Sequence, residues 1–522
     1  MNGRVASFFV VSILLLTSGA VYVRLVNGDL IDEGSLVLRD EIFIMGNSQF
    51  TLENGVVGGS GSENDPYIIE NWMMDNARGG RIEIIDTNSH VVIRNCKIWG
   101  YPNEGDAVVL RRASNISIQN CLIGNLDEGI KIRENARNII IQDCTLQDIN
   151  DGISLNENVN NISILNCTFQ KIREGIDLYD GANNITIQDC IMEEMDEGVV
   201  ILRNSENITI KDCSFKKIDE GLEFFGGNNI DIHDNIFLWN SVSMRLKGIT
   251  YSKIWNNSII GTEYTSILLG EGSDNNHVYN NIILRENDDH PFENDGINGA
   301  GITLYQSDNN TIELNHCSDI RSGISIRYSA GCEILDNKIY FNRSMSSDVN
   351  IIGISIEKSP YSLFEKNYML NCGLLLSGEE EIDFSTIYLD ETNKVDGNPI
   401  RMIKDEDKQI DLDGDYSQLI LVNCSGIDII DADQKTRGVF LTMASCEEIN
   451  IRENKFSDLF GFLYMWGCKN ITVKKNVFSD MIESVNIQNS TDLIIADNEF
   501  SNAYYGILGS FDNTLIANNN LK

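Results

Sequence analysis

Hydrophobic and polar residues alternate in short runs along most of this chain. The runs "NISIQNCLI", "NIIIQDCTL", "NISILNCTF", "NITIQDCIM" and "NITIKDCSF" share one frame, in which apolar residues occupy every second position before a cysteine. Cysteines of this column recur at intervals of 25, 23, 23, 23 and 23 residues, at Cys96, Cys121, Cys144, Cys167, Cys190 and Cys213. Such alternation predicts β-strands, and a repeat of about 22–23 residues predicts that the strands stack as coils of a solenoid.

One period, from Cys144 to Cys167, predicts three short strands. Alternation resumes after Asp151-Gly152, which we interpret as a turn, and again after Asn161. An asparagine precedes the same strand in each period, at Asn115, Asn138, Asn161, Asn184, Asn207 and Asn229. Because asparagine tolerates left-handed dihedrals, we expect these residues to form turns and to hydrogen-bond along their column. The sequence thus predicts an all-β fold of parallel coils.

The cysteine column is interpreted as interior packing. Side chains stacked on successive coils lie ~4.8 Å apart, wider than the Cβ separation of a disulfide, and no C-x-x-C pair suggests zinc. The spacing predicts that the column continues with both thiols and amides, through Asn235, Asn257, Asn281, Cys317, Asn337 and Asn367, then Asn454, Asn476, Asn498 and Asn519. A second thiol column follows at Cys424, Cys446 and Cys468.

Breaks in the repeat divide the chain into five predicted segments. An apolar run, residues 6–23, follows a basic N-terminus, so 1–27 is predicted to be a signal peptide or an N-terminal membrane anchor. Residues 28–85 form a cap and entry segment, 86–373 the first part of the solenoid, and 374–417 a charged interruption that we expect to wrap outside it. The last part, 418–522, ends without an amphipathic helix, which predicts an uncapped coil that self-associates.

The charge balance restricts the partners. Seventy-eight acidic residues against 40 basic ones give a net charge of −38. Such a surface repels phosphate backbones and anionic headgroups and attracts divalent cations. We therefore expect an exported body, extracellular or on the cell surface, that binds no nucleic acid and meets the membrane only through its N-terminal segment.

Two further segments carry a family resemblance. "GGSGSENDPYIIENW" and the late interruption "ETNKVDGNPI" followed by "LILVNCSGIDI" resemble the corresponding parts of archaeal NosD-like surface proteins, and the repeats in about 55–522 resemble carbohydrate-binding and sugar-hydrolase repeats. The resemblance implies a right-handed parallel β-helix of the pectin-lyase-like kind. It also implies a role in copper maturation, which we do not carry over because the chain has no cluster of histidine or methionine.

An acidic column precedes the glycine of each coil, at Glu128, Asp151, Glu174, Glu197 and Glu220, headed by Glu104 or Asp106. Stacked carboxylates repel one another, which should raise their pKa values unless cations intervene. Two interpretations stay open: the column binds Ca2+, which accepts several oxygen ligands in loose geometry, or it forms hydrated turns.

Outward positions two and four after that glycine suggest a carbohydrate site. They place Tyr179 and Phe225 to stack on sugar rings, and Lys131, Arg133 and Asn156 to bond hydroxyls. An ordinary sheet face is the alternative. Resemblance to pectate-lyase-like elimination implies a basic residue, for which the candidates are Lys131, Arg133, Arg111, Arg112, Arg321 and Arg327. Resemblance to polygalacturonases implies paired aspartates, for which Asp288 and Asp289 are candidates, although the family's G-H-G motif is missing.

Three functions follow as expectations. The first is an exported, non-catalytic cell-surface protein that binds extracellular polysaccharide or assembles with surface partners. The second is a polysaccharide lyase or hydrolase of pectin-lyase-like type. The third is a purely structural envelope element. The three functions differ in what they predict. A binding protein retains glycans without cleaving them, an enzyme cleaves them, and a structural element does neither but self-associates.

Overall fold

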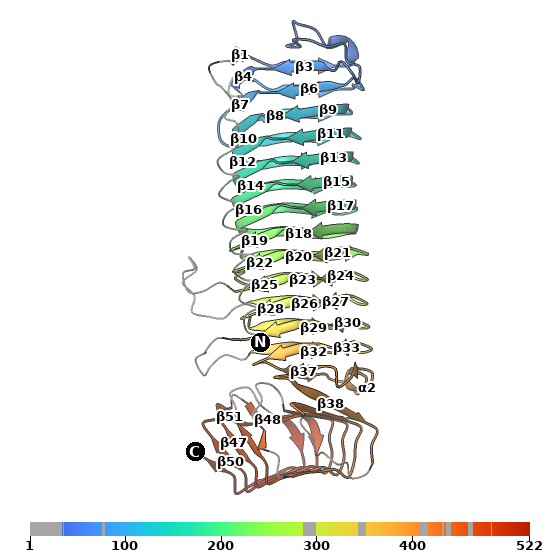
Figure 1. Ribbon diagram of the computed structural model, residues 1–522, viewed down its shortest axis with the longest axis vertical. Coiled ribbons are helices and arrows are strands. Elements are labelled where there is room, and N and C mark those ends of the chain that lie inside the picture. Colours follow the sequence, from blue (N-terminus) through green and yellow to red (C-terminus); the bar gives the residue numbers. More distant parts are fainter. Residues whose placement is uncertain are drawn as a thin grey trace, which may run out of the picture.

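The computed structural model describes Gly34 and residues 36–75, 79–285, 299–342, 351–407, 416–430, 433–434, 440–457, 463–481 and 483–522. Strands account for 62% and helices for 2%, and the strands form a right-handed parallel β-helix of about 18 turns (Figure 1). The predicted fold class is confirmed. Residues 6–23, Asp288 and Asp289 lie outside the described ranges. In the described part of the chain, no helix is long and apolar enough to cross a membrane.

The first coils contain short strands. They are β1 (Val37–Arg39), β2 (Ile42–Met45), β3 (Tyr67–Glu70), β4 (Trp72–Asp75), β5 (Ile82–Ile85), β6 (Val91–Arg94) and β7 (Lys97–Trp99), with one 3-10 turn at Asn47–Gln49. Longer strands follow: β8 (Asp106–Arg111), β9 (Ser114–Gln119), β10 (Leu122–Arg133), β11 (Arg137–Gln142), β12 (Thr145–Leu155), β13 (Asn160–Leu165), β14 (Thr168–Tyr179), β15 (Asn183–Gln188), β16 (Ile191–Leu202), β17 (Glu206–Lys211) and β18 (Ser214–His233).

Coils of three separate strands come next. They comprise β19 (Ile236–Leu238), β20 (Val242–Thr250), β21 (Lys253–Trp255), β22 (Ser258–Ile260), β23 (Thr265–Gly270), β24 (His277–Tyr279), β25 (Ile282–Leu284), β26 (Ala300–Tyr305), β27 (Thr311–Glu313), β28 (His316–Ser318), β29 (Ser322–Arg327), β30 (Glu333–Leu335), β31 (Lys338–Tyr340), β32 (Ile352–Glu357), β33 (Leu363–Glu365) and β34 (Tyr368–Leu370). The next strand is β35 (Leu374–Ser377), which is followed by a short helix, α2 (Ile382–Ser385). After the helix come β36 (Tyr388–Leu389), β37 (Lys394–Val395) and β38 (Asn398–Lys404).

The last part of the chain repeats the three-strand pattern. Its strands are β39 (Gln418–Val422), β40 (Asp428–Ile430), β41 (Asp433–Gln434), β42 (Leu441–Ala444), β43 (Asn450–Arg452), β44 (Lys455–Ser457), β45 (Leu463–Trp466), β46 (Thr472–Lys474), β47 (Val477–Ser479), β48 (Glu483–Thr491), β49 (Ile494–Ala496), β50 (Glu499–Ser501), β51 (Tyr505–Asp512), β52 (Leu515–Ala517) and β53 (Asn520–Leu521).

Three parallel sheets run along the first part. We call sheet 1 the series of strands that pass through β5, β8, the C-terminal half of β10 and its successors to β20, β23, β26, β29, β32 and β35. Equivalent residues pair one coil apart, as Ile153 pairs with Ile176. The side chains of each sheet therefore form straight columns, alternately inside and outside.

The acid-glycine pairs lie within continuous strands and are not turns, contrary to the sequence-based interpretation. Strand β12 passes through Asp151 and Gly152 without interruption. A Cβ atom on Gly152 would lie 2.4 Å from the carbonyl oxygen of Gly175 on the next coil. Glycine is required here because the coils approach closely where the strand passes into sheet 1 from the sheet that holds the N-terminal halves of β10, β12, β14, β16 and β18, which we call sheet 3. Strands β9, β11, β13, β15 and β17 belong to sheet 2.

The left-handed dihedrals predicted for the asparagine column are confirmed, but the turns are not. The backbone φ angles of the six asparagines lie between 54° and 63°, yet all six residues lie within strands, near the start of β9, β11, β13, β15 and β17 and inside β18. Asn138 donates its side-chain amide to Asn115 at 3.0 Å, and Asn161 donates to Asn138 at 2.9 Å. Hydrogen bonds along the axis of the stack thus join part of this asparagine column.

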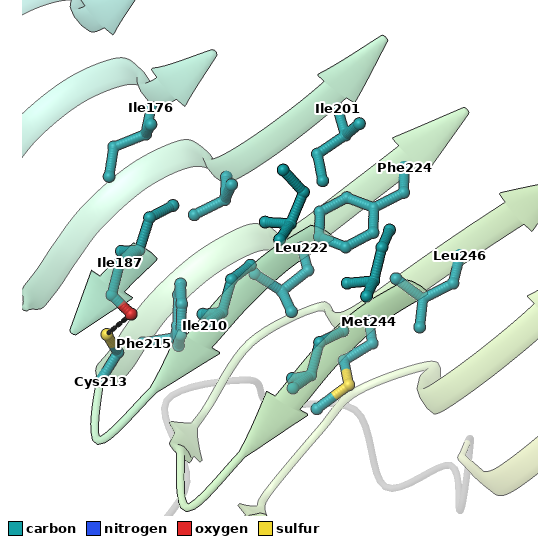
Figure 2. Close-up of a cluster of buried hydrophobic side chains, with 14 of the residues drawn as sticks. Ile176, Ile187, Ile201, Ile210, Cys213, Phe215, Leu222, Phe224, Met244 and Leu246 are labelled. Carbon is teal, nitrogen blue, oxygen red and sulfur yellow. Dashed lines mark hydrogen bonds between the residues drawn. The ribbon is translucent and has the colours of Figure 1, made fainter. Parts of the chain in front are cut away.

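The cysteine column lies in the interior, as predicted. All twelve cysteines are buried free thiols. The Cys213 thiol donates to the Ile187 carbonyl of the preceding coil at 3.7 Å, beside the isoleucines and phenylalanines that fill the coil (Figure 2). The thiols therefore act as small core residues with a weak donor.

Asparagines replace these thiols further along and form a continuous ladder. The Oδ1 atom of Asn257 accepts from the backbone N–H and the side-chain amide of Asn235, at 3.1 and 3.0 Å. The ladder continues through Asn281, Asn315, Asn337, Asn367 and Asn393. The placement of Cys317 in this column was wrong: Cys317 pairs with Ile283 and Ile339, and Asn315 occupies the ladder.

The predicted wrapping segment begins as a further coil. Strands β35, β36 and β37 stack in register on β32, β33 and β34. The chain then reverses, because β37 pairs antiparallel with β38, and β38 starts a new parallel stack with β39. Residues 374–395 therefore continue the solenoid and do not wrap around its outside. The chain changes direction after them, within the predicted interruption.

The last part lies across the lower end of the first (Figure 1). Leu419 and Leu421 face its own core, whereas Ile420 and Val422, on the other side of β39, pack into the core cluster of the first part. The side-chain amide of Gln418 pairs with the backbone of Leu374 at 2.9 Å in both directions. One solenoid therefore covers the open end of the other with the side of a sheet.

Candidate functional site

The acidic column forms on the outer face of sheet 1 in the predicted register. Each acid pairs with its equivalent one coil away, in the order Asp106, Glu128, Asp151, Glu174, Glu197 and Glu220. Asp106, and not Glu104, heads the column. Val242 follows Glu220, so the column ends there.

Two further outward columns run beside it. The second column contains Lys131, Ser154, Asp177, Val200 and Glu223, which pair in register and lead to Arg245. The third contains Tyr179, Leu202 and Phe225, which also pair in register, with Arg133 and Asn156 at the equivalent positions two coils and one coil earlier. The structure thus brings the predicted carbohydrate-binding residues onto one face.

Basic side chains already neutralise several of the acids. Lys131 Nζ lies 2.6 Å from Glu128 Oε1, and Arg245 Nη2 lies 2.6 Å from Glu220 Oε1. Between them, Arg173 contacts two acids at once: Asp151, at 2.6 Å, and Glu174. Lys131 is therefore an ion-pair partner in this structure, which competes with its predicted role as a base.

Asp177 is the most unusual group on this face. Only 1% of its surface is exposed, and neither carboxylate oxygen has a hydrogen-bond partner among the described residues. Burial, reinforced by the charge of Asp151, raises the pKa of Asp177 to about 8. Burial and Asp177 likewise raise the pKa of the neighbouring Tyr179 to about 12. Asp177 is consequently held as a neutral acid near pH 7.

Other acids on the face shift in the same direction. Burial is the largest cause that raises the pKa values of Glu128, Asp151 and Glu197, and repulsion by neighbouring acids adds to it. Burial and a hydrogen bond with Glu220 raise the pKa of Glu223 to about 7. The rise predicted for the acidic column is confirmed for Glu128, Asp151 and Glu197, but desolvation contributes more than mutual repulsion.

The aromatic residues provide the apolar part of the face. Phe225 is 42% exposed, and the Tyr179 hydroxyl lies 3.5 Å from Glu174 Oε2. Arg133 is half-buried, with its Nε 3.9 Å from Glu134. Sugar-binding sites combine such apolar surface with a few placed polar groups.

A hollow of about 380 Å³ lies along the edge of the acidic column. Its lining includes Asn150, Arg173 and Asp196, each directly before an acid of the column, and the apolar Ile149 and Ile172. Arg173 thus borders both the hollow and the carboxylates.

The other predicted bases are dispersed. Arg112 pairs with Asp86 at 2.6 Å and also contacts Glu134, and Arg111 lies 3.6 Å from Glu134. Arg327 pairs with Glu357 at 3.0 Å, many coils away. Arg321 lies directly before β29 in that distant region. Arg111 is the exception, because it pairs with Arg133 and so extends the third column by one coil, on the strand that begins at Asp106. The structure does not bring Arg112, Arg321 or Arg327 beside the acidic column.

Sequence reasoning missed the importance of Asp177 and Arg173. A signal was present for Arg173: the residue before the column acid is Asp127, Asn150, Asp196 or Asp219 in the neighbouring coils, and arginine only here. Asp177 occupies outward position two after the glycine of its coil, and its burial depends on the side chains around it, which the sequence does not show.

Comparisons with known proteins locate the chain in a family. The family model described as "Periplasmic copper-binding protein (NosD)" matches residues 47–270, 261–401 and 381–522. No curated protein sequence matches this chain.

Several solved structures overlap the fold in part. The surface adhesin PfbA of Streptococcus pneumoniae has 15% identity and a TM-score of 0.40, over 56% of this chain and 85% of that one. DFA-IIIase from Arthrobacter chlorophenolicus A6 has 13% identity and a TM-score of 0.40, over 58% and 86%. The periplasmic alginate epimerase AlgG has 12% identity and a TM-score of 0.31, over 66% and 82%. Overlap this low says nothing about what this chain does.

Within the described ranges, histidine and cysteine side chains do not gather into a copper centre. Copper sites in proteins use cysteine, methionine and histidine donors. All twelve cysteines are buried in the core, and burial raises the pKa of the Cys317 thiol to about 12. Within the described ranges, one group of three or more His, Cys, Asp or Glu side chains is close enough to share an ion, namely Asp151, Glu174 and Asp177. It offers oxygen atoms alone.

Proposed function

This chain belongs to the NosD family, described as periplasmic copper-binding proteins, and from that premise we propose that it is an exported β-helix protein that binds extracellular carbohydrate on the outer face of sheet 1. The family description supports export. The copper role has no support in the described donors. Export to the cell surface, and binding without catalysis, are parts of this proposal.

The apolar third column carries the proposal. Tyr179, Leu202 and Phe225 stack in register on three successive coils, which places the two rings about 9.6 Å apart, two interstrand spacings. Glu223 and the second column run alongside. An extended sugar chain laid along the stack would meet apolar surface and hydrogen-bonding groups at every coil.

A second candidate function is that of a polysaccharide lyase or hydrolase. One observation favours it: the pKa of Glu223 is raised to about 7, and Arg245 contacts both Glu220, at 2.6 Å, and Glu223, at 3.8 Å. A carboxyl group whose pKa lies near 7, beside a second carboxyl group in an ion pair, can serve as a general acid. Such an enzyme would use the same face.

A third candidate is a structural envelope element. The last described coil exposes Leu508, Leu515, Ile516 and Leu521, by 39%, 56%, 47% and 75%. A second copy of this chain could cover these side chains and the unpaired strand edges beside them. This candidate predicts assembly without any contribution from sheet 1.

A polysaccharide panel separates the three candidates. We would measure retention of each polymer, release of reducing or unsaturated ends, and the mass of the particles in solution. Carbohydrate binding predicts retention that Phe225→Ala weakens and that Tyr388→Ala, an exposed aromatic on another sheet, leaves unchanged.

The same panel can overturn the proposal. Release of sugar ends that disappears in Lys131→Ala or Arg133→Ala would establish the enzyme instead. Neither retention nor cleavage, together with assembly that Leu515→Asp abolishes, would establish the structural element.

A further inference from the structure

Three carboxylates from two coils converge on the outer face of sheet 1. Asp151 belongs to β12, and Glu174 and Asp177 belong to β14. One oxygen from each lies within 4.8 Å of the other two. Oxygens bound to opposite sides of one Ca2+ ion are about 5 Å apart, given Ca–O distances of about 2.3–2.6 Å. The cluster is therefore already close to the dimensions of a calcium site.

Asp177 provides an independent sign of a ligand. Its side chain is 99% buried, and both its oxygens lack a partner among the described residues. Buried carboxylates in proteins are almost always hydrogen-bonded, ion-paired or bound to a metal. One of these unpartnered oxygens lies within 4.8 Å of an oxygen of Asp151 and an oxygen of Glu174.

Arg173 leaves this cluster incompletely neutralised. It contacts Oδ1 of Asp151 and Oε1 of Glu174, but not Asp177. Three carboxyl groups thus share one guanidinium group, whose side chain is half-exposed, at 49%. A divalent ion among the oxygens would supply the missing charge and displace Arg173 in part.

The rest of the acidic column is less suitable. Glu128 is paired with Lys131 and Glu220 with Arg245, each at 2.6 Å. Glu197 faces Val200 where Glu174 faces Asp177, so its coil lacks the additional acid. The calcium site that was predicted along all five acids is therefore limited to the cluster of Asp151, Glu174 and Asp177.

We propose that Asp151, Glu174 and Asp177 bind one Ca2+ ion on the outer face of sheet 1. The carboxylates supply up to six oxygens, and water or a ligand hydroxyl completes the shell. Magnesium fits less well because its bonds of about 2.0–2.1 Å require a tighter cluster. A role of this ion in holding carbohydrate hydroxyls rests on the function proposed above, whereas the ion site does not.

Calcium binding to the full-length chain tests the site. Isothermal titration should give one tight Ca2+ per chain, with weaker binding of Mg2+. Asp177→Asn should weaken Ca2+ binding at least about tenfold, since ligand charge sets affinity in such sites. Glu197→Gln removes a charge one coil away without removing a ligand, so it should weaken Ca2+ binding clearly less than Asp177→Asn does. Circular dichroism confirms the fold of each variant, and Asp151→Asn replaces Asp177→Asn if the latter does not fold.

Three results would overturn the proposal: no tight Ca2+, several equivalent weak sites, or equal losses in Asp177→Asn and Glu197→Gln. The last two would show that the net charge of −38 collects cations without a site. Glycan retention is measured in parallel with Ca2+ and with a chelator. Ca2+ binding without glycan retention would support the ion site and overturn the carbohydrate proposal. Glycan retention without Ca2+ binding would overturn the ion site alone.

Discussion

The inside and the outside of the same coils follow different rules. Inside, one column holds cysteine on a series of successive coils and then asparagine on the coils that follow. Outside, the second column changes at every coil, from Lys131 through Asp177 to Glu223. Residue types repeat at positions where the coils must pack on one another, and they vary at positions without that constraint. A residue that departs from the repeat therefore marks a place with its own local chemistry. Asp177 and Arg173 are such departures.

The comparison also separates two interior solutions. A thiol column satisfies few hydrogen bonds and packs as apolar matter. In the asparagine ladder, the backbone N–H groups from Asn235 to Asn367 each donate to a side chain on the next coil. We therefore expect interior substitutions to change stability in proportion to the hydrogen bonds they remove, and exterior substitutions to change binding. Four substitutions test this expectation, in order of decreasing effect.

The largest effect is expected at the asparagine ladder. Asn281→Leu removes the acceptor for two donors of Asn257, at 3.1 and 3.0 Å, and the donor to the Ile254 carbonyl at 2.9 Å. Each buried group left without a partner costs about 1–3 kcal/mol, so the free energy of unfolding should fall by about 3–5 kcal/mol. Denaturant unfolding measures this loss. A fall under about 1 kcal/mol would mean that the ladder contributes packing alone.

Asp177 is the exterior position expected to behave like an interior one. Its pKa is about 8 in the folded chain and about 3.9 when unfolded. Between these values the folded state retains a proton that the unfolded state has lost, so stability falls as the pH rises from about 4 to about 8. In calcium-free buffer, Asp177→Asn should equal the wild type near pH 4 and exceed it by about 2–4 kcal/mol at pH 9. A difference that does not depend on pH contradicts this expectation.

A smaller loss is expected in the thiol column. Cys167→Ala removes a weak bond from Sγ to the Leu165 carbonyl at 3.4 Å and leaves a small cavity. The expected cost is about 1 kcal/mol, well below that of Asn281→Leu. Thermal and denaturant unfolding of the two variants, measured side by side, decide whether thiol and amide columns differ as proposed. Equal losses would show that both columns act by volume.

The smallest effect is expected in the acidic column outside the three-acid cluster. Burial and the charge of Glu220 raise the pKa of Glu197, so loss of its charge removes repulsion. Glu197→Gln should change stability by less than about 0.5 kcal/mol. Glu128→Gln serves as the contrast, because it also breaks the pair with Lys131. A loss above about 1 kcal/mol in Glu197→Gln would indicate a structural role for the column.

Much of the fold was predictable because it repeats. The interval of 23 residues assigned the interior and outward columns correctly from Cys96 to Cys213. It failed at Cys317, which lies two residues beyond Asn315, because an insertion hides which of two nearby positions continues the column. It also read Asp151-Gly152 as a turn, since the close approach of Gly152 to the next coil is not visible in one strand. The reversal at β37 and β38 had no periodic signal either.

By itself, the sequence determined which residues stack, because parallel coils keep equivalent residues in register and spacing alone reveals equivalence. The acidic column followed from that spacing, and its first member was narrowed to Glu104 or Asp106. Only the tertiary structure decided that Asp177 is buried without a partner, that Arg173 bridges two coils, and that β39 covers the end of the first solenoid. These features depend on contacts between residues that are not equivalent in the repeat. Spacing carries no information about such contacts, whereas packing and desolvation decide them.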